Sequence, residues 1–261
     1  MAEAMIKGLL QRKQIDPGRI CCADPQPQRL EKLHRQYGVE TTPSNAEALR
    51  GAEVGVLSIK PQMFSEVAQQ LCGVMPTEGL LLSIMAGVTT GNIVRRTSHP
   101  RVVRVMPNTP AQVGLGVSVW CATPDVSEPQ LEVARSVLQA LGSEHFVKRE
   151  EMLDMATALS GSAPAYVFLF MEALIDAGVH LGFSRQMAKD LVVQTIKGSA
   201  EYALQSDLHL ADLRNLVTSP GGTTADALYY LEKGGLRTVL SQAVRAAYLK
   251  SQKLSQLSEE E

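Results

Sequence analysis

Short apolar runs alternate with amphipathic segments over residues 1–150. The runs are nearly continuous in Val, Leu, Ile and Met, as is typical of strands buried on both faces of a sheet. We expect strands at Gly18–Ala23, Val54–Ile59, Gly79–Met85, Arg101–Met106, Gly116–Ala122 and Glu144–Val147. We expect helices at Met1–Leu10, through Leu30 and Leu33, and at Phe64–Cys72, Thr90–Arg96 and Glu128–Leu141. Strands separated by helices predict an α/β fold with a doubly wound parallel sheet.

The strand signal ends near Glu151. Met152–Gly182 then forms one long helical pattern interrupted at Pro164, and further helices are expected at Arg185–Gln205, Leu210–Leu216, Thr224–Lys233 and Gly235–Leu257. We therefore expect a sheet domain at residues 1–150 and an all-helical domain at residues 151–261. Because the helical domain must bury its apolar surface, we expect it to associate with a second subunit. One helical face carries the candidate contacts Val167, Phe170, Met171 and Leu174.

Residues 217–228 are expected to form a tight loop that leads into a helix. Pro220, Gly221 and Gly222 exclude regular structure in the first half, and Ala225 and Leu228 restart a helical apolar stripe. The start of a helix presents unpaired backbone N–H groups and a partial positive charge. Glycines without side chains let a carboxylate or a phosphate approach those groups closely.

Hydroxyl groups accompany this loop. Ser219, Thr223 and Thr224 can each donate a hydrogen bond to a substrate nitrogen or oxygen. The alternative is a purely structural helix start, since Thr223 and Asp226 have the spacing of a capping box.

Polar turns follow several of the expected strands, at the edge where doubly wound sheets bind ligands. These turns are Asp24–Pro25, Ser58–Gln62, Ala86–Thr89 and Met106–Pro110. Lys60 either pairs with an anionic cofactor or extends its ammonium group to water. Asn108 either contacts a ligand or bonds to its own backbone in a rigid turn.

Composition and charge narrow the function classes. A net charge of −2 gives no basic surface for nucleic acid. No apolar run approaches the length of a membrane span, and Met1–Arg12 lacks a secretory signal, so we expect a cytoplasmic protein without membrane contact. Cys21, Cys22, Cys72 and Cys121 show neither metal-ligand spacing nor a disulfide framework, so we expect no metal and buried, reduced thiols.

Five motifs, in order along the chain, resemble those of pyrroline-5-carboxylate reductase. They are Ser58–Pro61, Ser83–Val88, Arg104–Pro110, Leu159–Tyr166 and Val217–Leu228. The resemblance implies a Rossmann-type cofactor domain, a C-terminal helical dimerisation domain, and the last step of L-proline synthesis. It also implies a small-molecule substrate and a homodimer or a higher homo-oligomer.

The resemblance also implies roles for single residues. Gly221, Gly222 and Thr223 would hold the substrate carboxylate through backbone N–H groups, with Ser219 assisting. Thr224 would be the catalytic hydroxyl, donating a hydrogen bond to the ring nitrogen of the imine, and Ser162 would lie close to the substrate.

The cofactor would be NADPH or NADH. Asp24 favours NADH, because a carboxylate at the end of this strand binds the adenosine ribose and repels a 2′-phosphate. Asn45 matches a family position that contacts the 2′-phosphate, so we expect both cofactors to be used. The implied cofactor-binding residues are Asp24, Asn45, Ser58, Ile59, Lys60, Pro61, Ala86 and Asn108.

The chain departs from the family pattern at its N-terminus. Members begin with a strand and a Gly-rich phosphate loop, whereas Met1–Gly8 already reads as the following helix. We therefore expect the sequence to be a truncated reading whose first strand is missing. Its expected place lies between the strands at Gly18–Ala23 and Val54–Ile59 on one side and the strand at Gly79–Met85 on the other. Two alternatives stay open: an inactive dinucleotide-binding homologue, and a different dehydrogenase. A hydroxy-acid dehydrogenase of this architecture would need a catalytic lysine within Met152–Tyr166, which contains none.

Overall fold

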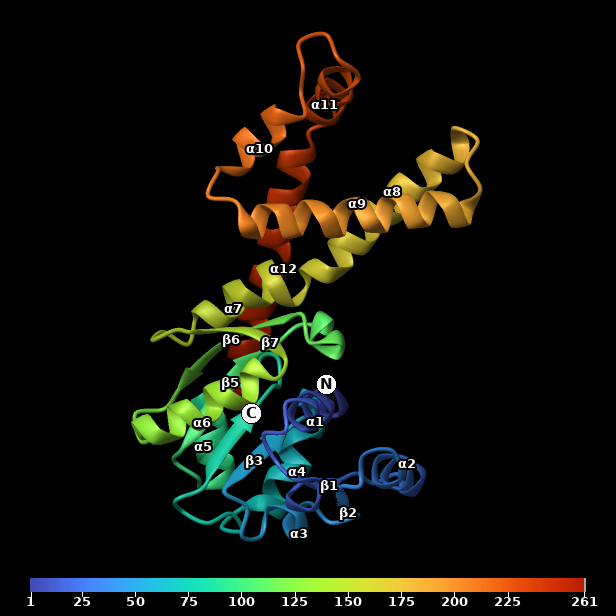
Figure 1. Cartoon of the computed structure of the whole chain (residues 1–261). Coiled ribbons are helices and arrows are strands. Elements are labelled where there is room, and N and C mark those ends of the chain that lie inside the picture. The colour runs from blue at the N-terminus through green and yellow to red at the C-terminus, as the bar shows by residue number, and fades with distance from the viewer. Residues whose placement is uncertain (261) are drawn as a thin grey trace. The chain divides into compact units, whose positions relative to one another are not determined.

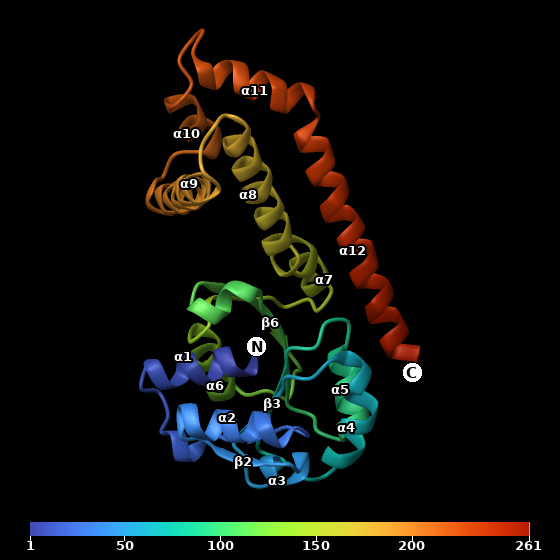
Figure 2. The ribbon, with the colours of Figure 1, turned by 90° about the vertical axis from the view of Figure 1, so that its right-hand side faces the viewer.

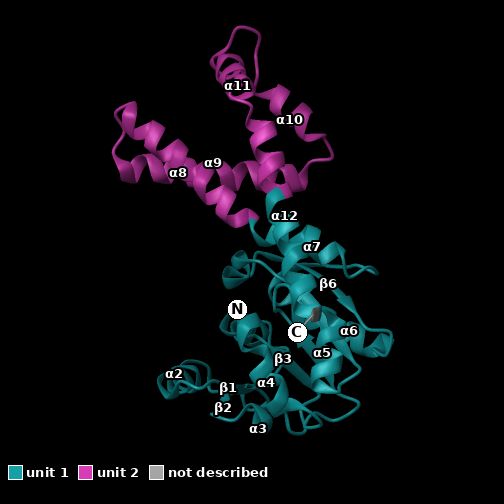
Figure 3. Cartoon of the chain, turned by 180° about the vertical axis from the view of Figure 1, so that it is seen from behind, with its two compact units in different colours: residues 1–162, 246–261 teal, residues 163–245 magenta. Residues whose placement is uncertain are grey.

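The structure is a computed structural model, and it describes residues 1–260. It divides into two compact units, Met1–Ser162 together with the chain from Ala246 onward, and Ala163–Arg245 (Figure 3). This division differs from the expected one at 150/151. The reason is that helix α7 (Met152–Ala156) packs on strands β5 (Val102–Met106) and β6 (Gly116–Ala122) of the first unit.

The sheet of the first unit has five strands in the order β3-β4-β5-β6-β7. The remaining bounds are β3 Val54–Leu57, β4 Leu80–Ser83 and β7 Gly142–Phe146. A separate pair joins β1 (Cys21–Ala23) to β2 (Glu40–Thr42) in parallel. The sequence pattern missed β2, because Glu-Thr-Thr carries no apolar run.

Helices cover both faces of the five-stranded sheet, which confirms the doubly wound arrangement. On β4, Leu80 and Leu82 pack in one core with residues of α1 and α6, whereas Leu81 packs in a second core with residues of α4 and α5. Figure 2 shows α4 and α5 together on one side. Besides α7 and the end of α12, this unit contains the helices α1 Ala2–Gln11, α2 Pro27–Tyr37, α3 Asn45–Leu49, α4 Phe64–Leu71, α5 Thr90–Thr97 and α6 Glu128–Gln139.

The sheet is mixed rather than wholly parallel, which corrects the prediction for its second half. Strands β3, β4 and β5 are parallel, but β6 runs antiparallel to β5 and parallel to β7. Only the short turn η3 (Thr109–Val113) connects β5 to β6. A parallel pair needs a crossover of a dozen residues or more, so this short connection requires an antiparallel pair.

The predicted place of a missing strand is also wrong. Val54 pairs directly with Leu80 and Leu57 with Ser83, so no strand fits between β3 and β4. Within residues 1–260, β1 and β3 belong to different sheets.

The second unit is all-helical, as predicted. It holds α8 Ala163–His180, α9 Arg185–Gln205, α10 Leu210–Leu216, α11 Thr223–Lys233 and the first part of α12 Leu236–Glu260. Helices α8 and α9 lie side by side (Figure 1).

The break in the long helical pattern precedes Pro164 instead of occurring at it. Residues Thr157–Gly161 form a π-helical turn, η4, closed by the Ser162 N–H donating to the Thr157 carbonyl at 2.8 Å. Pro164 is the second residue of α8, where a missing N–H breaks no helical hydrogen bond.

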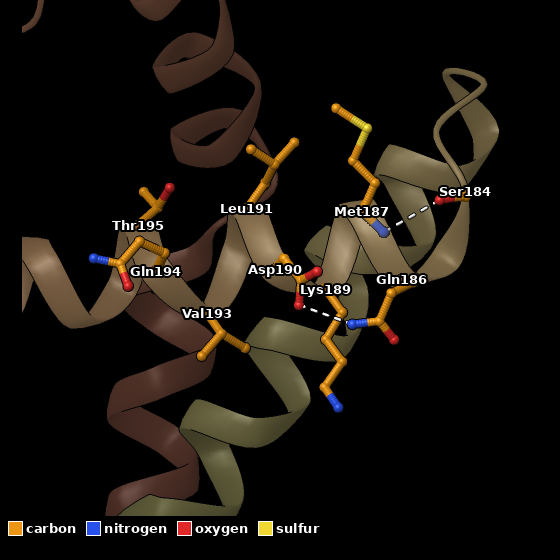
Figure 4. A pocket seen from close by; sticks show the side chains of 9 residues that line it. All are labelled: Ser184, Gln186, Met187, Lys189, Asp190, Leu191, Val193, Gln194 and Thr195. Carbon is orange, nitrogen blue, oxygen red and sulfur yellow. Dashed lines mark hydrogen bonds between the residues drawn. The ribbon is translucent and has the colours of Figure 1, made fainter.

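Apolar surface is unusually exposed on the second unit. Phe168 and Leu169 of α8 are 60% and 66% exposed, and the predicted contacts Val167, Phe170 and Leu174 are exposed as well. Along α9 a shallow groove runs from Ser184 to Thr195, where the Ser184 hydroxyl accepts from the Met187 N–H at 3.2 Å (Figure 4). These faces have no apolar cover within the described chain.

The expectation that no apolar run approaches the length of a membrane span needs correction. The helical stretch Met152–His180 is long and apolar enough to cross a membrane by length and composition, with a mean hydropathy of 1.5 in its most apolar window. The full length of this helical stretch is not evident from the sequence pattern, because a break is expected at Pro164. A helix that buries an apolar face against another subunit passes the same test.

Gly8 provides a test of how α1 packs against α6. A Cβ atom at Gly8 would lie 2.2 Å from the carbonyl oxygen of Ala140, the residue that ends α6. Gly→Ala inside a helix normally stabilises a protein by about 0.5–1 kcal/mol. Here we expect Gly8→Ala to destabilise the protein by about 1–3 kcal/mol, because the backbone of α6 must move.

The measurement is chemical denaturation of Gly8→Ala beside Gly91→Ala. Gly91 lies in the first turn of α5, where an added Cβ meets nothing within 4 Å, so that control should keep or slightly raise the stability. Equal stability of the two variants would contradict the close approach of α1 and α6.

Candidate active site

The loop between α10 and α11 is the candidate binding element of the second unit. A tight turn spans Ser219–Gly222, with the Gly222 N–H donating to the Ser219 carbonyl at 3.0 Å. Pro220 occupies the second position and Gly221 the third, with φ +69°. Proline followed by a residue with positive φ is the signature of a type II turn, which explains the Pro-Gly pair.

The helix that follows begins without a side-chain cap. Gly222 is the N-cap of α11, so the expected capping box of Thr223 and Asp226 is wrong. Ala225 donates back to the Gly222 carbonyl at 3.0 Å, whereas the backbone N–H groups of Thr223 and Thr224 have no acceptor within residues 1–260. Two backbone donors therefore point out of the helix start, where an anion is favoured.

The predicted residues of this loop differ in what they offer. Gly222 loses its N–H to the turn, so its expected role as a carboxylate donor is not available in this conformation. A Cβ at Gly222 would lie 2.4 Å from the Ser219 Oγ, so a larger residue there would displace the Ser219 hydroxyl. The hydroxyls of Ser219, Thr223 and Thr224 bond to no residue in the described chain. Thr224 is half-buried and the other two are exposed.

The turns that follow β3, β4 and β5 are candidate binding elements of the first unit. Because these strands are parallel, the turns that contain Ser58, Ala86 and Asn108 lie along one edge of the sheet. Ser58 and Ile59 are half-buried, whereas Lys60, which begins the turn η2 (Pro61–Met63), is exposed.

Asp24 directly follows β1, and Asn45 lies shortly after β2. The Asp24 carboxylate accepts from the Gln26 N–H at 2.9 Å and lies 3.4 Å from the Arg29 guanidinium. Asn45 is the first residue of α3 and donates to Gln70 at 2.9 Å. The Asp24 carboxylate and the Arg29 guanidinium therefore lie close together after β1. The sequence analysis considered only Asp24.

Asn108 makes structural contacts at both ends of its amide. It donates to the Ser160 carbonyl at 3.2 Å and accepts from the Val117 N–H at 2.9 Å. The amide therefore ties the turn after β5 to the π-helical turn that precedes Ser162. The side chain of Asn108 does not bond to its own backbone within the turn, because its partners are Val117 in β6 and Ser160 in the π-helical turn.

A buried charged network lies beneath these turns, and the sequence reasoning missed it. Arg104 of β5 is 3% exposed and donates to the Glu150 carboxylate at 2.7 Å. Asp154 of α7 lies 4.0 Å from the same guanidinium and accepts from Ser251 and Ser255 of α12. The available signal was Arg104 itself, since a charge inside an apolar strand requires a buried partner.

The cysteines differ from the expectation that all are buried. Cys121 is buried, but Cys21 and Cys72 are exposed. Burial raises the pKa of Cys121 to about 12 and that of Cys22 to about 11, so both thiols stay protonated at neutral pH. Within residues 1–260, His, Cys, Asp and Glu form no group that could hold a metal ion.

Comparison with known proteins decides the family. The chain is 40% identical to pyrroline-5-carboxylate reductase from Synechocystis over 254 residues, covering 97% of this chain and 94% of that protein. It is 40% identical to the Pseudomonas aeruginosa enzyme of that name over 257 residues, covering 98% and 94%. The chain belongs to the pyrroline-5-carboxylate reductase family.

Structural and family-model matches agree with this membership. The pyrroline-5-carboxylate reductase from Coxiella burnetii superposes with a TM-score of 0.90 at 36% identity, covering 97% of this chain and 94% of that one. The model described as pyrroline-5-carboxylate reductase dimerisation matches residues 150–254. The model described as NADP oxidoreductase, coenzyme F420-dependent, matches residues 1–87. The predicted order of a Rossmann-type domain and a helical dimerisation domain is thereby confirmed.

Proposed function

We propose that this chain reduces 1-pyrroline-5-carboxylate to L-proline by hydride transfer from NADPH or NADH. The observation that carries the proposal is the Ser219–Thr224 loop, which presents two backbone N–H groups and hydroxyls at the start of α11. A carboxylate and a ring nitrogen are the groups that such donors recognise. The substrate carries both.

The residues present fit a nicotinamide dinucleotide. At the sheet edge they offer the Asp24–Arg29 pair for a ribose or a phosphate, the Asn45 amide, and the exposed Lys60 ammonium for a phosphate. The dinucleotide, when bound, supplies the hydride. We assign its binding to Asp24, Asn45, Ser58, Ile59, Lys60, Pro61, Ala86 and Asn108, where Asn108 acts by holding the turn after β5.

The remaining chemistry is assigned to the loop before α11. The N–H groups of Gly221, Thr223 and Thr224 bind the carboxylate, with the Ser219 hydroxyl assisting. The Thr224 hydroxyl donates to the ring nitrogen and draws electron density from the C=N bond, which makes the imine carbon more electrophilic. Positioning and electrostatics suffice because no bond to the protein has to form. We assign Ser162, at the end of the π-helical turn, to the substrate as well.

Oxidation of NADPH and NADH, followed with and without pyrroline-5-carboxylate, tests this function. Substrate-dependent oxidation with formation of proline supports it. Cofactor binding without turnover would favour the inactive homologue. Turnover of a hydroxy acid in place of the imine would favour another dehydrogenase.

Thr224→Ala should lower kcat by about ten-fold or more, because one hydrogen bond to a polarised group is worth roughly 1.5–3 kcal/mol. The dissociation constant of the cofactor should change little. Thr224→Ser keeps the hydroxyl and should retain most of the rate. Steady-state kinetics of the three proteins provides the measurement, and unchanged turnover in Thr224→Ala would remove Thr224 from the mechanism.

Asp24→Ser should shift the cofactor preference toward NADPH. The change removes the carboxylate that repels a 2′-phosphate and leaves the Arg29 guanidinium, now 3.4 Å from that carboxylate, without its anionic partner. The ratio of kcat/KM for NADPH to that for NADH should rise. Asp16→Ser removes an exposed acid of the preceding segment and should leave the ratio unchanged. An equal ratio in all three proteins would refute the role of Asp24.

A homodimer or a higher homo-oligomer is the proposed assembly, with α8 contributing Val167, Phe170, Met171 and Leu174. These side chains belong to the segment matched by the dimerisation model. Phe170→Glu should dissociate the assembly, because it places a charge in a desolvated interface. Multi-angle light scattering gives the mass, and a monomeric parent protein would contradict the assembly. A cytoplasmic location, with no role for membranes or nucleic acid, is part of the same proposal.

A further inference from the structure

The turn between β4 and α5 is a loop with little access to solvent. Met85, Gly87, Val88 and Thr89 are buried, while Ala86 is half-buried. Gly87 has φ +75°, and a Cβ there would lie 2.9 Å from the Leu254 Cβ of α12. Backbone polar groups in such a loop need partners inside the protein. The loop is therefore held in one conformation by its neighbours, and Ala86 is its proposed contact with the cofactor.

Glu150 accepts hydrogen bonds from Thr90, the residue at which this loop enters α5. Its carboxylate accepts from the Thr90 backbone N–H at 2.8 Å and from the Thr90 hydroxyl at 2.5 Å. It also accepts from Arg104 at 2.7 Å. Three donors thus converge on one carboxylate, and one of them is the first N–H of α5, where negative charge is favoured.

Helix α12 also contacts the start of α5. Asn92, in the first turn of α5, bonds to the Ser258 carbonyl and donates to its hydroxyl at 2.9 Å. Asp154, the second carboxylate beside Arg104, accepts from Ser251 at 2.6 Å and so joins α7 to α12. The Asn92 contacts hold α5 against α12 without Glu150. Loss of Glu150 therefore releases the loop at Thr90 rather than detaching α5.

We propose that Glu150 is a positioning residue for hydride transfer, acting through Thr90 on the loop that carries Ala86. The inference rests on the proposed function, because it assigns the loop to the cofactor. Glu150 touches neither substrate nor cofactor. Its carboxylate fixes the loop before the cofactor binds, so that less conformational freedom is lost on binding.

The test compares Glu150→Gln, Thr90→Val and the double variant with the parent protein. Glu150→Gln keeps the size of the side chain and removes its charge. Thr90→Val removes only the hydroxyl and leaves the Arg104–Glu150 ion pair intact, so it remains informative if Glu150→Gln does not fold. Glu151→Gln is the control, since Glu151 is exposed. The readouts are the Kd of NADPH by titration calorimetry, KM for pyrroline-5-carboxylate, and Tm.

We expect Glu150→Gln to raise the Kd of NADPH by about ten-fold, as for the loss of one hydrogen bond to a charged group. Thr90→Val should raise it by a smaller factor, and the double variant should match Glu150→Gln, because both changes break the same contact. KM for the substrate should stay within about two-fold, since the substrate is assigned to another loop. Glu151→Gln should behave as the parent protein.

Two outcomes would overturn the inference. One is an unchanged Kd of NADPH in both Thr90→Val and any folded Glu150→Gln protein, whatever happens to Tm. The other is a double variant whose effect on Kd is the product of the two single effects. A parent protein that binds NADPH but does not reduce pyrroline-5-carboxylate would instead refute the proposed function. In that case the Kd values of the variants would still test whether Glu150 positions the loop.

Discussion

The Arg104 guanidinium places a permanent positive charge inside an otherwise apolar sheet, and its neutralisation organises the carboxyl edge of the first unit. Removing a cation from water costs several kcal/mol unless anions and hydrogen bonds surround it. Glu150 and Asp154 supply the anions. Each carboxylate is in turn bonded to a different element, Glu150 to the start of α5 and Asp154 to α12. One buried charge therefore connects strand, loop and two helices.

This arrangement explains why the last part of α12 belongs to the first compact unit. Ser251, Ser255 and Ser258 of that helix bond to residues of α7 and α5, and Leu254 packs on Gly87. Serine side chains are small enough to allow this close approach, and the hydroxyls of Ser251 and Ser255 donate hydrogen bonds to the Asp154 carboxylate. Two turns at this edge are held by polar side chains: the turn after β4 through Thr90 and Glu150, and the turn after β5 through Asn108.

The start of α11 at Gly222 differs from these loops, because its backbone donors are left without partners in the described chain. Its donors stay available because the preceding turn uses only one of them, the Gly222 N–H. Sequence reasoning found the loop and its hydroxyls, since Pro220, Gly221 and Gly222 have strong local preferences. It could not decide between a self-capped helix and open donors. That choice depends on backbone dihedral angles over residues 219–223, which no single residue type determines.

The sequence by itself determined the strands β3 to β6, both faces of the sheet and the helices of the second unit, because hydrophobic periodicity reports burial directly. It missed β2, since Glu-Thr-Thr pairs through its backbone without an apolar signal. Only the tertiary structure decided the antiparallel direction of β6 and the partners of Arg104 and Asn108. Glu150 lies 46 positions from Arg104 and Ser160 lies 52 positions from Asn108, and local pattern carries no information about which distant groups meet. The burial of a side chain is reflected in the local sequence pattern, whereas the pairing of distant residues depends on the complete fold.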